Sequence, residues 1–185
     1  MSNTRSSLHR LIITAILLAV GLVLPFLTGQ IPTLGKVISP LHIPALICGL
    51  TCGPLWGAVL GLILPPLRSL LFGMPAMIPT GLSMAFELMA YGLLGGLLYP
   101  LLRSRLKAGS HLPAILLAMV IAMIGGRLVG GAAQAIILGA TGGSYTFAAF
   151  VAAYFVNTAV GALIHLVLVP AIVLALEKAK LSPLR

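Results

Sequence analysis

Long apolar runs alternate with short breaks of proline, glycine and charged residues along the whole chain. A helix needs about 20 apolar residues to cross the hydrocarbon core of a membrane. The breaks divide the chain into six predicted helices, at about 9–28, 41–53, 54–72, 79–102, 113–138 and 147–176. The pattern therefore predicts an all-α polytopic membrane protein, in which a six-helix transmembrane bundle forms one domain over residues 1–185.

The predicted helix at 41–53 is too short to span a membrane alone. Gly53 and Pro54 set its end, because proline removes a backbone donor. The next helix starts at once, so we expect a tight helical hairpin. The segment at 29–40, which contains Gly29, Pro32, Gly35 and Pro40, is predicted to be a long loop and a candidate lid.

Glycines recur at four-residue spacing inside the predicted helices. They form three rows: Gly49, Gly53, Gly57 and Gly61; Gly92 and Gly96; Gly126 and Gly130. Small residues at this spacing let helix backbones approach closely in lipid. We expect these rows to pack helices of the same chain against one another.

Composition agrees with a membrane protein, since 60% of residues are hydrophobic and only 7% are charged, against roughly a quarter charged in soluble domains. The net charge of +9 does not indicate nucleic-acid binding, because the basic residues are scattered without an aromatic-interleaved stripe. Cys48 and Cys52 lack neighbouring Cys or His at metal spacing. We expect them to pack as small residues, with no metal site or disulfide.

Charge predicts the orientation of the bundle. Eight of the 11 basic residues flank three helix ends: Arg5, Arg10, Arg103, Arg105, Lys107, Lys178, Lys180 and Arg185. With six spans these ends share one face, and basic residues concentrate on the cytoplasmic side. We therefore expect a multi-pass protein of the plasma membrane with both termini in the cytoplasm, while the outer loops carry only Lys36.

The N-terminal segment also has features of a signal peptide, since two arginines precede the apolar run at 11–27. That run ends through Pro25, Phe26 and Gln30 rather than at a small-residue cleavage site. We interpret it as the first membrane helix.

Polar side chains interrupt the apolar segments at seven positions: His42, Arg68, Glu87, Arg127, Gln134, Asn157 and His165. An unpaired ionisable group at membrane depth costs at least about 2.5–3.5 kcal/mol, so such groups face a bundle interior or a cavity. At about 1.5 Å per residue, all but His165 fall within about 16 Å of the outer surface. These six are predicted to form a substrate-binding site, and the deeper His165 to be an interior packing or hydrogen-bonding residue.

The charges suggest what this site binds. Glu87 is expected to pair with Arg127 or Arg68, which by itself would be only neutralisation of buried charge. Two arginines against one glutamate nevertheless leave one positive charge over. A guanidinium binds carboxylate or phosphate through two parallel hydrogen bonds, so we expect an anionic or zwitterionic solute.

Three tyrosines extend the predicted site. Tyr91 lies one turn beyond Glu87, and Tyr154 lies three residues before Asn157, so each shares its partner's helix face. Tyr145 lies in the loop before the last helix, where it could close over a ligand.

Catalytic groups and an energy source are missing. Glu87 and Glu177 are the only acids, so no carboxylate pair is available for acid–base or metal-dependent chemistry. Gly29 to Lys36 departs from a phosphate-binding loop, with five residues between its glycines and Val37 after the lysine. No cofactor is indicated. We interpret the chain as a transporter subunit and not an enzyme, the alternatives being a membrane-embedded enzyme or an ion-coupled carrier acting alone.

Three stretches of the chain resemble sequence patterns of a known family. Ala15-Ile-Leu-Leu-Ala19 matches an AxxxA pattern in the first helix, and SPLHIPALICGL at 39–50 and PPLRSLLFGMP at 65–75 are similar to its second and third helices. The chain thus resembles the substrate-specific S component of energy-coupling factor (ECF) vitamin transporters over its whole length.

The resemblance implies partners and a mechanism. Ala15 and Ala19 would dock a transmembrane scaffold subunit that two ATPase subunits power. The S component would bind its ligand in the outer half, beneath the loop joining the first two helices, and topple in the membrane to release it. Pantothenate, whose carboxylate would suit Arg127 or Arg68, is favoured over pyridoxine-like, cobalamin-like and queuosine-precursor ligands.

Overall fold

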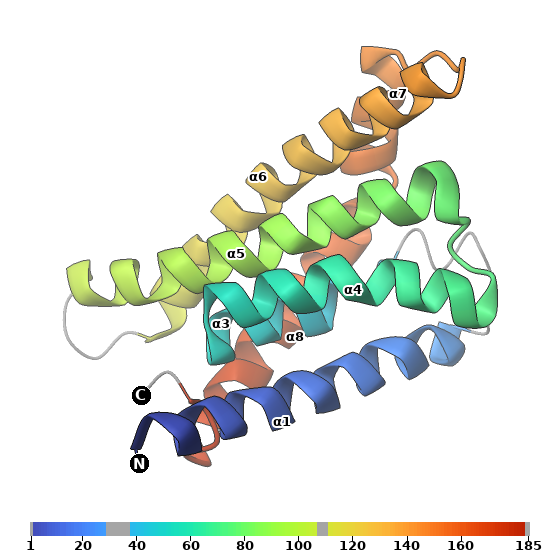
Figure 1. The fold of residues 1–185 in the computed structure, drawn as a ribbon. Helices are drawn as coiled ribbons and strands as arrows, with labels where there is room; N and C mark the ends of the chain where they lie inside the picture. Colours follow the sequence, from blue (N-terminus) through green and yellow to red (C-terminus); the bar gives the residue numbers. More distant parts are fainter. Residues whose placement is uncertain (1, 29–37, 107–110, 184–185) are drawn as a thin grey trace.

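The computed structural model describes residues 2–28, 38–106 and 111–183, and these contain helices and turns but no strand. The long helices are α1 (Ser2–Val23), α4 (Pro54–Phe72), α5 (Leu82–Arg105), α6 (His111–Ala140) and α8 (Ala159–Lys178), with shorter α3 (His42–Cys52) and α7 (Phe147–Val151). Single helical turns at Leu24–Thr28, Met77–Gly81 and Ala152–Val156 extend α1, α5 and α7. Five segments are long and apolar enough to cross a membrane, and the predicted all-α membrane bundle is confirmed (Figure 1).

The short helix α3 packs against α4 as the second arm of a hairpin. Gly53 joins them with φ of 103°, a conformation that favours glycine, and Pro54 begins α4. Most of the candidate lid at 29–40 lies outside the described residues.

Glycines bring α3, α4 and α5 into direct backbone contact. A Cβ added at Gly49 would meet the backbone of Gly92, and one at Gly92 would meet the backbone of Gly57. One turn further along, a Cβ at Gly61 would meet the backbone of Leu88. The four-residue glycine spacing thus coincides with a close approach of the three helix backbones.

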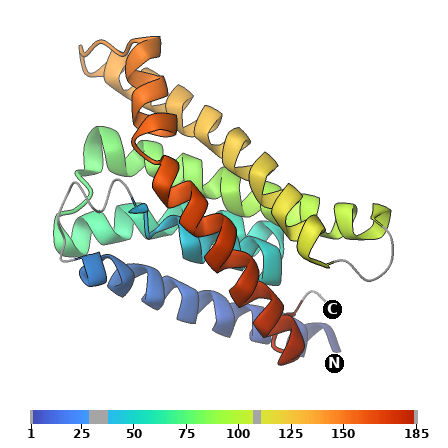
Figure 2. The ribbon, with the colours of Figure 1, turned by 180° about the vertical axis from the view of Figure 1, so that it is seen from behind.

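The last predicted helix, at 147–176, is broken rather than continuous. Its first part ends at Val156 and α8 begins at Ala159 in a different direction, which Figure 2 shows as a bend between orange and red. Thr158 lies at the bend, where its hydroxyl donates to the Tyr154 carbonyl at 2.7 Å. The break was not predicted, because residues 147–160 contain no proline or glycine.

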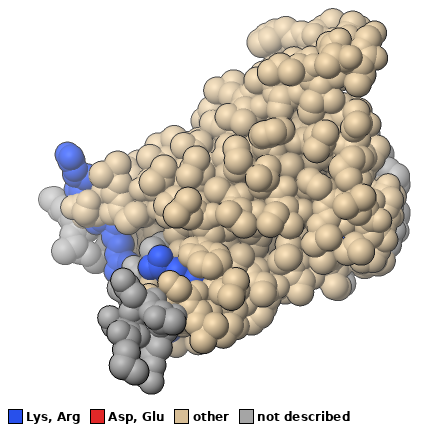
Figure 3. Space-filling model, viewed as in Figure 1, with Lys and Arg blue, Asp and Glu red and all other residues tan. Residues whose placement is uncertain are grey.

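The start of α1, the end of α5, the start of α6 and the end of α8 lie at one end of the bundle (Figure 1). On the face shown in Figure 3, Lys and Arg gather at this end. The buried Glu177 joins helices here: it accepts a hydrogen bond from Tyr99 at 2.6 Å and contacts His111 at 2.7 Å and Arg103 at 3.7 Å. One of the two acids therefore links α5, α6 and α8 at the basic end of the molecule.

Candidate functional site

A cavity of about 470 Å³ opens among the helices. It lies between the start of α3, the end of α4, the first half of α5, the middle of α6 and the bend before α8. Seven of the predicted site residues line it: His42, Arg68, Glu87, Arg127, Gln134, Tyr154 and Asn157. Its volume is that of a small-molecule site.

Glu87 is engaged by neighbours other than arginine. Its carboxylate contacts His42 Nε2 at 3.3 Å and accepts a hydrogen bond from the Tyr91 hydroxyl at 3.0 Å. His42 Nδ1 in turn lies 3.0 Å from the Ser39 carbonyl, which can only accept. Nδ1 therefore carries a proton, and Nε2 faces the carboxylate of Glu87.

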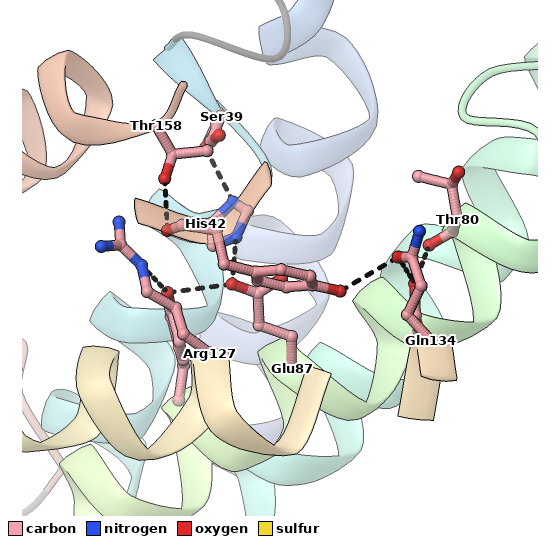
Figure 4. Close-up of polar contacts among 10 residues, drawn as sticks. Ser39, His42, Thr80, Glu87, Arg127, Gln134 and Thr158 are labelled. Carbon is pink, nitrogen blue, oxygen red and sulfur yellow. Dashed lines mark hydrogen bonds and ion pairs between the residues drawn. The ribbon is translucent and has the colours of Figure 1, made fainter. Parts of the chain in front are cut away.

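The arginines take different partners from the expected ones. Arg127 Nε donates to the Tyr91 hydroxyl at 3.3 Å, and its guanidinium lies 5.4 Å from the Phe155 ring centre. Figure 4 shows its two terminal nitrogens pointing away from the group around Glu87. No ion pair joins Arg127 to a carboxylate in the described part of the chain.

Arg68 is only 2% exposed, yet it too lacks an ion pair with either glutamate. Its guanidinium donates to the Leu22 carbonyl and lies 5.2 Å from the ring centres of Phe26 and Phe72. Aromatic faces and a carbonyl attract a cation without neutralising it. The expected pairing of Glu87 with Arg127 or Arg68 is thus wrong, and the cavity keeps both arginine charges.

Gln134 is held in place from two sides. Its side-chain oxygen accepts hydrogen bonds from Ser83 at 2.9 Å and Tyr154 at 3.1 Å, as Figure 4 shows. These bonds connect α5, α6 and the turn before α8 across the cavity. The amide nitrogen of Gln134 has no hydrogen-bond partner among the described residues and is therefore available to a bound solute.

Two predicted tyrosines do not line the cavity. Tyr91 is buried behind it, where it bridges Glu87 and Arg127. Tyr145 lies between α6 and α7, and is not among the lining residues. Burial and the nearby charge of Glu87 raise the pKa of the Tyr145 hydroxyl, which therefore stays neutral.

His165 lines the cavity, although its sequence position suggested packing. Its ring stacks on His42 with centroids 5.7 Å apart and planes inclined by 20°. Its predicted depth assumed one straight helix from 147, whereas α8 starts anew at Ala159. The bend therefore brings His165 to the cavity. Ser39, Ser83 and Thr158, which no sequence feature singled out, also line it.

Comparison with known families identifies the chain. The family described as "ECF transporter, substrate-specific component" matches residues 9–173. No match was found among curated proteins or among solved structures. The match covers most of the chain, including the stretches at 39–50 and 65–75 that carried the resemblance, and it accompanies five helices able to span a membrane. The chain therefore belongs to the family of substrate-specific components of ECF transporters.

Proposed function

We propose that this substrate-specific membrane subunit takes up a small vitamin carrying a carboxylate, with pantothenate as the first candidate. One observation carries the proposal: Glu87 contacts His42, and among the described residues Arg68 and Arg127 have no carboxylate partner. Retaining two cations beside a cavity in lipid is costly. An anionic ligand offsets that cost, because it supplies the missing charge.

Each cavity residue has a distinct proposed role. Arg127 binds the carboxylate of the ligand through its terminal nitrogens. The hydroxyl of Tyr91 orients the guanidinium by accepting a hydrogen bond from Arg127 Nε. Arg68, already held by Leu22 and two aromatic rings, adds positive potential. The further ligand contacts are expected from His42, Glu87, Gln134, Tyr154 and Asn157. Tyr145 is not proposed to contact the ligand, because it does not line the cavity.

The cavity also favours pantothenate over the other vitamin classes. About 470 Å³ holds a molecule of this size, whereas the corrin ring of a cobalamin is far larger. Pyridoxine and the deazaguanine precursors of queuosine carry no carboxylate for the arginines.

The first prediction is that purified protein distinguishes pantothenate from pantothenol, which replaces the carboxylate by a hydroxymethyl group. Pantothenate at 100 times its dissociation constant should stabilise the fold by about 2.7 kcal/mol. Pantothenol should bind at least about tenfold more weakly, since it forms no charge-assisted pair with arginine. Thermal unfolding and calorimetry measure both. Equal affinity for the two compounds, or no binding of pantothenate, would refute the proposal.

We further propose that the basic end of the bundle faces the cytoplasm and that Ala15 and Ala19 contact the ECF scaffold subunit. Both alanines lie on an exposed face of α1, beside Ile12 and Ile16, which are 49% and 56% exposed. Small side chains on an apolar face permit close helix contact in lipid. The energy would come from the ATPase subunits bound to that scaffold.

Replacing Ala15 or Ala19 with tryptophan should therefore leave pantothenate binding in detergent unchanged but abolish uptake by cells that contain the scaffold and ATPase subunits. The bulky ring holds the helices apart without touching the cavity. Leu163→Trp, at a 65% exposed position on α8, is the control and should transport normally. Normal uptake by both alanine variants would disprove the docking assignment.

A further inference from the structure

Buried polar atoms without hydrogen bonds occur at three of the described residues, Arg10, Tyr145 and His165, and His165 is the one that lines the cavity. The imidazole is 2% exposed, and neither ring nitrogen has a hydrogen-bond partner within the described part of the chain. The peptide groups of Ile38 and Ser39 come near the ring, but their geometry leaves both nitrogens unbonded. Buried polar groups are nearly always hydrogen-bonded in proteins, so this exception requires a reason.

Its neighbour His42 shows the contrast. Both nitrogens of His42 are engaged, one with Ser39 and one with Glu87. The two rings lie nearly parallel, so His42 supports one face of His165 and supplies no hydrogen bond to it. His42 thus holds the ring of His165 in place, while the two nitrogens of His165 make no hydrogen bond within the described residues. Such an arrangement is typical of a group that is preorganised for a ligand.

The unused groups of the cavity differ in kind. The terminal nitrogens of Arg127 can only donate, which suits a carboxylate. A neutral imidazole instead presents one donor and one acceptor. A hydroxyl group matches it, because a hydroxyl can donate and accept at once.

We propose that His165 binds a hydroxyl group of the solute and makes this subunit selective for hydroxylated carboxylates. The inference rests on the proposed function and deepens it. Pantothenate has its carboxylate at one end and its two hydroxyls at the other, as two separate subsites require. His165 is then a specificity-determining residue, whose small displacement on binding exposes a nitrogen to the ligand.

The test compares pantothenate with its dideoxy analogue N-(3,3-dimethylbutanoyl)-β-alanine, which keeps the carboxylate, amide and carbon skeleton. Wild-type protein should bind pantothenate about tenfold or more tightly than the analogue. His165→Phe keeps a ring for stacking on His42 but removes both nitrogens. It should lose about tenfold affinity for pantothenate and almost none for the analogue, so the discrimination disappears.

Two further variants make the comparison specific. His165→Gln, which retains a donor and an acceptor, should recover part of the discrimination. His9→Phe removes a histidine near the N-terminus, far from the cavity, and should leave both affinities unchanged. If the phenyl ring prevents folding, His165→Leu provides the same test with a smaller side chain.

The outcomes separate this inference from the function on which it rests. If wild-type protein binds pantothenate and the dideoxy analogue equally, or if His165→Phe keeps the wild-type discrimination, His165 is not the hydroxyl site and the carboxylate proposal stands. If wild-type protein binds neither compound, the proposed function fails and the inference fails with it.

Discussion

Replacing Arg127 with alanine is expected to weaken pantothenate binding by about ten- to a hundredfold. A hydrogen bond to a charged group contributes about 1.5–3 kcal/mol, and 1.4 kcal/mol corresponds to a factor of ten in affinity. Arg127 is expected to bind the ligand directly, because its terminal nitrogens point away from the hydrogen-bonded residues around Glu87 (Figure 4). Isothermal calorimetry on detergent-purified protein measures the change.

Two variants control for charge and for fold. Arg127→Lys keeps the positive charge but loses the planar fork, so its affinity should fall between those of wild type and Arg127→Ala. Arg105→Ala removes an exposed arginine at the last residue of α5, whose first half lines the cavity, and this variant should bind pantothenate normally. The thermal stability of each ligand-free variant shows whether the fold is retained. Unchanged affinity in a folded Arg127→Ala protein would remove Arg127 from the site.

The largest structural effect is expected at Gly92, where one added methyl group should lower the apparent unfolding temperature by about 5 °C or more. A Cβ at this position would overlap the backbone of Gly57, and a helix backbone cannot move aside as a flexible side chain does. Overpacking a dense interior typically costs about 1–3 kcal/mol, and 1 kcal/mol corresponds to about 2–4 °C in a chain of this size. Thermal unfolding in detergent measures the shift.

Gly95 provides the matched control on the same helix. A Cβ there would meet only the Leu50 side chain, at 3.9 Å, which is ordinary van der Waals contact. Alanine is also the better helix former by about 0.5–1 kcal/mol, so Gly95→Ala should be neutral or stabilising. Equal stability of the Gly92→Ala and Gly95→Ala proteins would mean that α4 and α5 do not pack through Gly57 and Gly92.

Helix positions were predictable because they depend on local properties. In lipid, a backbone must satisfy its hydrogen bonds within its own segment, so a long apolar run has to be helical. The predicted helix at 54–72 coincides with α4, since glycine stands at each side of it and proline starts it. The segment at 147–176 was misjudged, because the bend at Thr158 depends on a side-chain bond and on packing rather than on a proline or glycine.

The members of the site were more predictable than their contacts. Seven predicted residues line the cavity, since any polar side chain in an apolar run must avoid lipid. The partner of Glu87 was not foreseen: arginine was expected, but His42, 45 positions away in the chain, occupies the position.

The amino-acid sequence by itself determined the membrane environment, the number and extent of most helices, the family, and the residues that had to turn inward. The family follows from its sequence motifs. The other properties follow from the transfer free energy of each residue or segment, which does not depend on its neighbours in space. Tertiary structure alone decided that His42 contacts Glu87, that neither arginine pairs with a glutamate, and that His165 reaches the cavity. Such pairings depend on contacts of about 3 Å between distant parts of the chain, which are set only when the helices pack and rotate against one another.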